Sequence, residues 1–189
     1  WYIESCHKIK YMFPKAHACA YVMSAIRIAW FKVYKPLYYY AAFFSIRVDD
    51  FDIDTMIKGY NAIKTRYDDL MAKGFEATNK ETNIIESLHI ALEATARGIK
   101  FAPISLEKSD ATRFIVDEEH ENTLIPPFKT IDGLGLTVAK TIVEAREQGP
   151  FLSKEDLQKR GKVSKTLTDK MAEMGIVSEL PDSNQLSLF

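Results

Sequence analysis

The sequence has 189 residues, of which 47% are hydrophobic and 27% are charged, with a formal net charge of −1 at pH 7. This composition excludes wholesale disorder, because nearly half of the residues can contribute to a core. No apolar run reaches the roughly 18 residues that a membrane span needs, so we expect no membrane partner. The two cysteines lack CxxC spacing, so we expect no disulfide framework, no metal site and a reduced, cytoplasmic setting.

Charge is distributed unevenly along the chain. Residues 1–48 carry a net charge of +6, residues 49–128 a net charge of −7 and residues 129–170 a net charge of +3. Two basic blocks separated by an acidic one favour two surfaces that face a polyanion, although ordinary surface charge explains the same pattern equally well. The chain begins at Trp1 rather than Met, from which we expect a cut within a longer polypeptide.

Hydrophobic periodicity predicts a mainly α fold. We expect helices over 15–34, 36–46, 54–73 and 80–97, the third capped by Asp54, with the aromatic residues of the second in the core. Two short strands are expected at 99–102 and 113–116. The stretch Leu124-Ile125-Pro126-Pro127-Phe128 is interpreted as a stiff, extended linker between two domains.

A glycine-containing turn follows this linker. Ile131-Asp132-Gly133-Leu134-Gly135 precedes a helix expected from Thr137 to Glu147, with Ala139 near its start. This pattern resembles the helix-hairpin-helix motif. Glycines permit positive φ in a tight turn and let a phosphate approach the amides of the helix N-terminus. Such contacts read the DNA backbone rather than its sequence.

A second, degenerate hairpin is expected at Gly161-Lys162-Val163-Ser164, before a helix that ends near Met174. The two halves resemble the tandem form of the module, which grips both strands of a duplex. A helical protein–protein module is the alternative, and the second hairpin could be purely structural. The expected DNA-binding residues are Lys129, Gly133, Leu134, Gly135, Lys140, Lys162, Ser164 and Lys165.

The chain ends with Gln185-Leu186-Ser187-Leu188-Phe189, preceded by a polar stretch, Pro181 to Asn184. This pentapeptide resembles bacterial sequences that bind the sliding clamp. Leu188 and Phe189 would fill an apolar pocket, Leu186 would add apolar contact, and Gln185 would make polar contacts. A tail packed on its own domain is the alternative. Residues 181–184 are expected to form a flexible tether.

The string Phe13-Pro14-Lys15-Ala16-His17-Ala18, with the motifs above, resembles the family C replicative polymerases of the PolC type. This resemblance implies that residues 1–123 are a helical fingers-type segment, 124–128 the linker, 129–177 a tandem helix-hairpin-helix domain that binds duplex DNA, and 178–189 a flexible tail with the clamp peptide. It implies a bacterial replisome protein whose partners are primer-template DNA, the sliding clamp and the incoming deoxynucleotide. The residues implied near that nucleotide are Phe13, Lys15, His17 and Tyr21.

The same resemblance implies that the catalytic carboxylates and their magnesium ions belong to a palm that this chain lacks, so the chain is expected to be inactive alone. The acidic run Asp49, Asp50, Asp52 and Asp54 is interpreted as a solvated loop and helix cap. Two other readings stay open. The chain could be a free-standing helix-hairpin-helix adaptor with a clamp-binding tail, or a structural helical module without DNA affinity.

Overall fold

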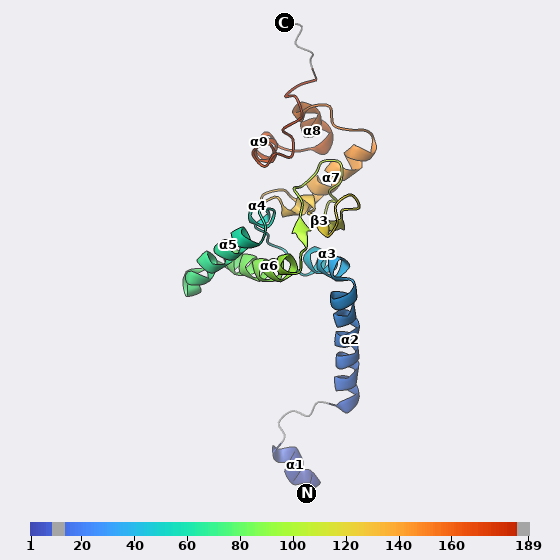
Figure 1. Cartoon of the computed structure of the whole chain (residues 1–189), viewed down its shortest axis with the longest axis vertical. Helices are drawn as coiled ribbons and strands as arrows, with labels where there is room; N and C mark the ends of the chain where they lie inside the picture. The colour runs from blue at the N-terminus through green and yellow to red at the C-terminus, as the bar shows by residue number, and fades with distance from the viewer. Residues whose placement is uncertain (9–13, 185–189) are drawn as a thin grey trace.

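The computed structural model describes residues 1–8 and 14–184. The fold is mainly helical with short strands, as predicted, although the described residues form three strands rather than the two expected (Figure 1). Most of the elements form one body, from which α2 projects. In chain order the elements are α1 (Tyr2–Lys8), α2 (Lys15–Tyr34), α3 (Pro36–Ile46), α4 (Ile53–Met56), α5 (Tyr60–Ala72), η1 (Gly74–Glu76), α6 (Asn79–Ala96), β1 (Lys100–Phe101), β2 (Ile115–Val116), β3 (Thr123–Ile125), η2 (Phe128–Thr130), α7 (Leu136–Glu147), α8 (Lys154–Gly161) and α9 (Lys165–Glu173).

Local signals in the sequence explain where several helices begin. Pro36 occupies the first turn of α3, where its missing amide hydrogen has no role in the helix. Thr78 and Glu81 form a reciprocal capping box at the start of α6. The predicted helices 15–34 and 36–46 are therefore confirmed, and α6 lies within one residue of the predicted 80–97.

The predicted helix 54–73 is wrong at its start. Asp52, rather than Asp54, is the cap: it accepts a hydrogen bond from the amide of Thr55 and begins the short helix α4. Gly59 then adopts a φ of +84°, which interrupts the helix before α5. The hydrophobic period continues across this break, so periodicity alone could not reveal it.

The face of α3 that enters the core also differs from expectation. Tyr40 and Phe44 are fully buried, whereas Tyr38 is 61% and Ile46 is 78% exposed. The helix is apolar on all sides, with the sequence PLYYYAAFFSI, so its period does not identify the inward face. The prediction that the aromatic residues of α3 lie in the core is therefore correct for Tyr40 and Phe44 and wrong for Tyr38.

The strands form one sheet in the order β1-β3-β2. Strand β3 pairs in parallel with β1, with Thr123 opposite Lys100, and antiparallel with β2, with Ile125 opposite Ile115. The expected linker 124–128 therefore begins in the central strand, and all five of its residues are buried. Its backbone is extended up to Pro127, and Phe128 begins η2. The segment is part of the core, because its apolar side chains are buried.

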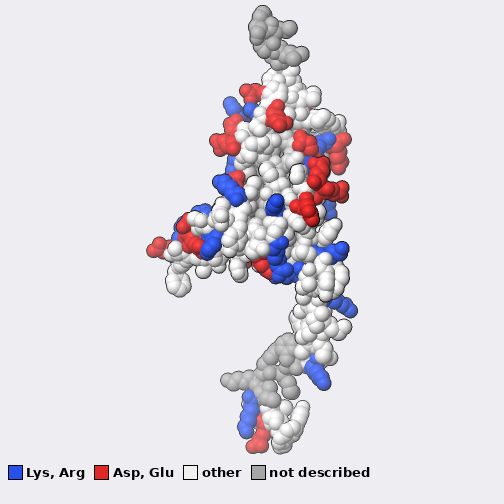
Figure 2. Space-filling model, in the orientation of Figure 1, with Lys and Arg blue, Asp and Glu red and all other residues white. Residues whose placement is uncertain are grey.

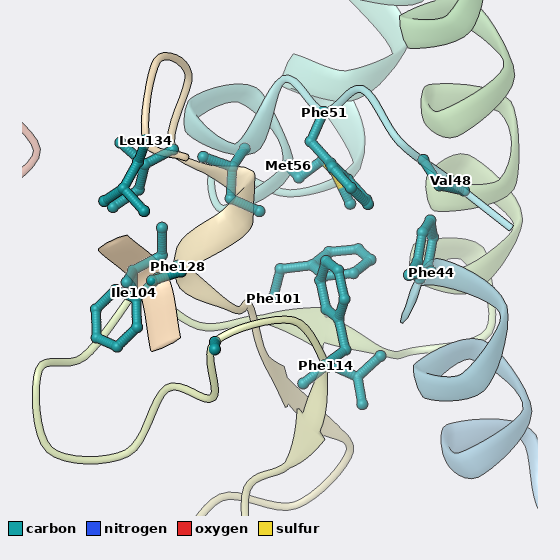
Figure 3. Close-up of a cluster of buried hydrophobic side chains, with 14 of the residues drawn as sticks. Phe44, Val48, Phe51, Met56, Phe101, Ile104, Phe114, Phe128 and Leu134 are labelled. Carbon is teal, nitrogen blue, oxygen red and sulfur yellow. The ribbon is translucent and has the colours of Figure 1, made fainter. Parts of the chain in front are cut away.

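The core joins the sheet to the hairpin region (Figure 3). The ring of Phe44 lies 5.4 Å, centroid to centroid, from both Phe101 and Phe114. The same continuous cluster of buried side chains includes Phe128 and Leu134. The first hairpin turn is thus fixed to the same core as α3, while the predicted division into two domains stays a prediction.

Like α1, helix α2 lies outside this packing, because none of its residues is buried. Figure 1 shows it extending away from the body, and Figure 2 shows only white and blue side chains along it, since it contains no Asp or Glu. Lys32 near its end pairs with Glu93 of α6 at 2.8 Å. Within residues 1–8 and 14–184, no helix combines the length and apolar character that crossing a bilayer requires.

Candidate nucleic-acid interface

Two glycines with different conformations build the turn that begins α7. Gly133 has a φ of +87°, which an L side chain rarely adopts, whereas Gly135 has an ordinary φ of −70°. Leu134 between them is only 6% exposed and anchors the turn in the core. The need for positive φ therefore explains Gly133 but not Gly135.

Gly135 is the N-cap of α7, and among the described residues no side chain accepts a hydrogen bond from the amides of the first helical turn. Ala139 is four residues on, and its amide donates to the carbonyl of Gly135 at 3.0 Å. The amides before it lack acceptors within the helix. A Cβ atom added to Gly135 would meet nothing within 4 Å. The N-terminus of α7 is therefore an open set of donors that favours an anion.

The turn between α8 and α9 repeats the geometry of the first turn. Lys162 has a φ of +53°, Val163 is buried, and Ser164 begins α9 with a φ of −68° and a ψ of 156°. The corresponding values at Gly135 are −70° and 151°. Buried positions on α7 and α9 also correspond, with Ala139 and Ile142 on the first helix matching Thr168 and Met171 on the second.

The second turn differs from the first in its side chains. The hydroxyl of Ser164 accepts a hydrogen bond from the amide of Leu167 at 3.3 Å, so a donor at this helix start is already used. Gly161 does not hold the turn open. A Cβ atom there would lie 3.1 Å from Leu157 and 3.3 Å from Ile142, so this glycine allows α8 to pack closely on α7.

The start of α8 is closed as well. Ser153 accepts a hydrogen bond from the amide of Asp156 at 3.0 Å. The amides of Lys154 and Glu155 donate to the carbonyls of Pro181 and Asp182, at 2.9 and 3.1 Å. Residues 181 and 182 were expected in a flexible tether. They are instead held on α8, because their carbonyls accept hydrogen bonds from amides that have no acceptor within the helix.

The predicted DNA-binding lysines fall into two groups. Lys140, Lys162 and Lys165 are exposed on or beside the two hairpins. Lys129 instead points inward: its Nζ donates to the carbonyl of Ser45 at 2.9 Å, and burial lowers its pKa. Lys129 therefore ties the hairpin segment to the end of α3, and a DNA contact by its ammonium group is not supported.

Asp132 lies in the first turn between two lysines that sequence reasoning missed. Its Oδ1 is 2.5 Å from Nζ of Lys80, and Nζ of Lys170 donates to its carbonyl oxygen at 2.7 Å. The hydrogen bond from Lys80 holds the pKa of Asp132 below its usual value, with a further contribution from Lys170. The partners lie 52 and 38 residues away along the chain, and no sequence spacing predicts such contacts.

The predicted nucleotide-proximal residues of α2 are all exposed. The rings of His17 and Tyr21 meet edge to face, with their centroids 4.5 Å apart. Lys15 is in the first turn, two residues before His17, so its side chain points to another side of the helix. Five further predicted site residues lie outside the described residues, namely Phe13, Gln185, Leu186, Leu188 and Phe189.

The acidic run has structural partners. Asp52 pairs with Arg66 at 2.9 Å in addition to capping α4, and Asp50 accepts a hydrogen bond from Asn83 at 2.8 Å. These contacts agree with the loop-and-cap interpretation.

One group of three possible metal ligands occurs among the described residues: Asp117, Glu119 and His120. Nζ of Lys108 lies 2.5 Å from Glu119 and 3.8 Å from Asp117. His120 in turn contacts Asp117 at 2.7 Å. Lys108 therefore already contacts both carboxylates of this group, and the group carries no metal assignment.

Comparison with known proteins supports the hairpin geometry. The helix-hairpin-helix motif family matches residues 98–186. The PolC-type DNA polymerase III of Bacillus subtilis (strain 168) is 59% identical over all 189 residues, and that of Listeria monocytogenes is 57% identical. The chain spans 13% of the length of each of these relatives. The resemblance inferred from its motifs is confirmed: along its whole length, the chain is a relative of one segment of PolC-type DNA polymerase III.

Proposed function

We propose that this chain is the C-terminal, duplex-binding part of a DNA-directed DNA polymerase of the bacterial replisome. The observation that carries the proposal is the open N-terminus of α7, with Gly135 as a cap that has no side chain. The motif match and the similarity to PolC-type polymerases support the phosphate backbone of DNA as the ligand of this anion site. Phosphate would accept hydrogen bonds from the first-turn amides and be attracted by the helix dipole.

The second hairpin would contact the same duplex through side chains. Lys162 and Lys165 are exposed at its turn, and Ser164 can donate its hydroxyl hydrogen to a phosphate while accepting from Leu167. Lys140 on α7 would add a further charge. Because these contacts are to the backbone, affinity should be independent of sequence and should fall steeply with salt.

Helix α2 would contribute to the pocket for the incoming deoxynucleotide. Its exposed, acid-free surface carries Lys15, a point charge that suits phosphate, and the adjacent rings of His17 and Tyr21. Phe13 would complete this group. Completion of the pocket requires another segment of the polymerase, because α2 buries none of its own residues on this chain.

The catalytic step is assigned to a different segment. In the acidic run, Asp52 caps α4 and pairs with Arg66, and Asp50 accepts a hydrogen bond from Asn83. They therefore do not form a free carboxylate cluster for magnesium. We propose that magnesium and phosphoryl transfer belong to the palm, and that this chain alone is inactive.

The terminal peptide would tether the polymerase to its sliding clamp. The proposal rests on the sequence Gln185-Leu186-Ser187-Leu188-Phe189. The preceding residues Pro181 and Asp182 are held on α8 by hydrogen bonds from the amides of Lys154 and Glu155. Deleting residues 185–189 should abolish binding to the clamp of a PolC-containing bacterium, measured by surface plasmon resonance, and leave duplex affinity unchanged. Retained clamp binding would place the contact elsewhere.

Duplex binding is tested by fluorescence anisotropy of the 189-residue chain with labelled primer-templates of several random sequences, from low to physiological salt. We expect one affinity for all sequences and a linear decrease of its logarithm with the logarithm of salt concentration. An absence of binding at low salt would contradict the proposal and favour a structural role for the hairpins.

A further inference from the structure

Three charged groups from distant parts of the sequence meet at the first hairpin turn. Lys80 comes from the first turn of α6, Asp132 from the turn itself and Lys170 from α9. Nζ of Lys80 lies 2.5 Å from Oδ1 of Asp132, and Nζ of Lys170 lies 3.7 Å from Oδ2. Asp132 thus brings two ammonium groups to the turn, and Lys80 lines the same pocket as Gly133 and Gly135.

Asp132 is unfavourable for a phosphate site by itself, because a carboxylate three residues before Gly135 repels an anion at that helix start. Asp132 lines a pocket of about 300 Å³ beside the first turn, and Asp49 and Asp50 line this pocket as well. Without the two lysines, the surroundings of the turn would be acidic. Lys80, which lines this pocket with Lys129, and Lys170, which contacts Asp132, therefore offset negative charge that would oppose a phosphate.

The contacts among these groups are open to solvent. The side chains of Lys80, Asp132 and Lys170 are 53%, 67% and 36% exposed. Ion pairs at such exposure contribute little to stability. A DNA phosphate offers each lysine a charge-assisted hydrogen bond together with the release of condensed counterions. Exchange of the carboxylate for a phosphate is therefore physically accessible.

We propose that Lys80 and Lys170 are additional phosphate contacts of the first hairpin, and that Asp132 holds them in place in the free chain and gives them up when DNA binds. This inference rests on the proposed duplex-binding function. It adds to that function a DNA contact from α6, in the segment before the hairpins, and a second contact from α9. Asp132 would position both lysines near the turn and would also lower the affinity for DNA.

The test compares Lys80→Gln, Lys170→Gln and Asp132→Asn in the full 189-residue chain, with the same random-sequence duplexes and salt series. Each lysine variant should bind about twofold to tenfold more weakly and should reduce the salt slope by about one, as expected for one lost phosphate contact. Asp132→Asn should bind several-fold more tightly, because a repelling charge is removed and both lysines are released.

Matched controls lie on α5, where Lys64 and Asp68 form an exposed ion pair at 3.0 Å. Lys64→Gln and Asp68→Asn change the net charge in the same way, on α5, which packs against α4 and α6 outside the hairpin region (Figure 1). Both should leave affinity and salt slope unchanged. If they shift binding as much as the turn variants do, net charge rather than position is responsible and the inference is wrong.

The outcomes separate this inference from the function on which it rests. Weaker binding by Gly135→Ser together with unchanged binding by both lysine variants would overturn the inference and leave the hairpin function intact. Weaker binding by Asp132→Asn, with a lower melting temperature, would show that Asp132 is a structural tie and would also overturn it. If the unsubstituted chain itself shows no salt-dependent binding to duplex DNA, the proposed function is contradicted.

Discussion

The two hairpin turns of this protein have nearly the same backbone and different chemistry. In the first, Gly133 takes the positive φ and Gly135 leaves the start of α7 open. In the second, Lys162 takes the positive φ and Ser164 caps α9 with its own hydroxyl. Backbone geometry therefore shows that the turns are repeats, whereas only the side chains indicate which helix start is available to a ligand.

This difference separates a requirement of folding from a requirement of binding. Gly133 is needed for the turn itself, because of its φ of +87°. Gly135 has an ordinary φ and an unobstructed Cβ position, so the fold does not explain the missing side chain. Close approach of a ligand does explain it, and substitutions at the paired positions test the distinction.

The largest expected effect is on folding at the positive-φ positions. Gly133→Val should lower the free energy of unfolding by about 1–3 kcal/mol, because a β-branched residue is strained at this φ. Lys162→Gly, its counterpart, should instead stabilise the chain by up to about 1 kcal/mol, since it relieves the same kind of strain. Urea denaturation followed by circular dichroism measures both. Equal stability for Gly133→Val and the original chain would contradict the role assigned to Gly133.

The second largest effect is expected from Gly135→Ser, which should weaken DNA binding without destabilising the fold. Gly135→Ser should preserve or slightly raise the melting temperature, because serine is a favourable N-cap, as Ser164 is in the second turn. Duplex affinity should fall roughly twofold to tenfold, which corresponds to the loss of one net hydrogen bond. A stable variant that binds DNA as tightly as the original chain would show that the amides of α7 do not contact phosphate.

The smallest effect is expected from the reverse change in the second turn. Ser164→Gly should cost only a few tenths of a kcal/mol, whereas Ser164→Ala should cost about 1 kcal/mol, because alanine is a poor N-cap. In Ser164→Gly, the freed amides of α9 can replace the serine hydroxyl as donors to phosphate, so duplex affinity should be maintained. A marked loss of affinity in both variants would assign the DNA contact to the serine hydroxyl itself.

Much of the fold could be predicted from local signals. Pro36, the hydrophobic period of residues 80–97 and the hairpin glycines marked helices and turns that the structure contains. The errors had a common origin in tertiary context. The period of the helix expected from Asp54 onward could not reveal the break at Gly59, and the all-apolar α3 did not identify its buried face.

The candidate site was predictable to the extent that it is local. The turn residues from Gly133 to Gly135 and the second turn at 161–164 could be read directly from the sequence. The inward position of Lys129 and the partners of Asp132 could not, because both depend on segments 38 to 84 residues away. Exposed lysines near a motif cannot be distinguished from buried ones by spacing alone.

The central claim, that the open start of α7 holds a DNA phosphate, is tested most directly by NMR. The isotope-labelled chain would be titrated with a short random-sequence duplex while the amide signals of Leu136, Thr137 and Val138 are followed. We predict that these signals shift most at low salt and return as salt is added, and that the amide of Leu167, already bonded to Ser164, shifts less. Saturable duplex binding that leaves the first-turn amides of α7 unshifted would contradict the account.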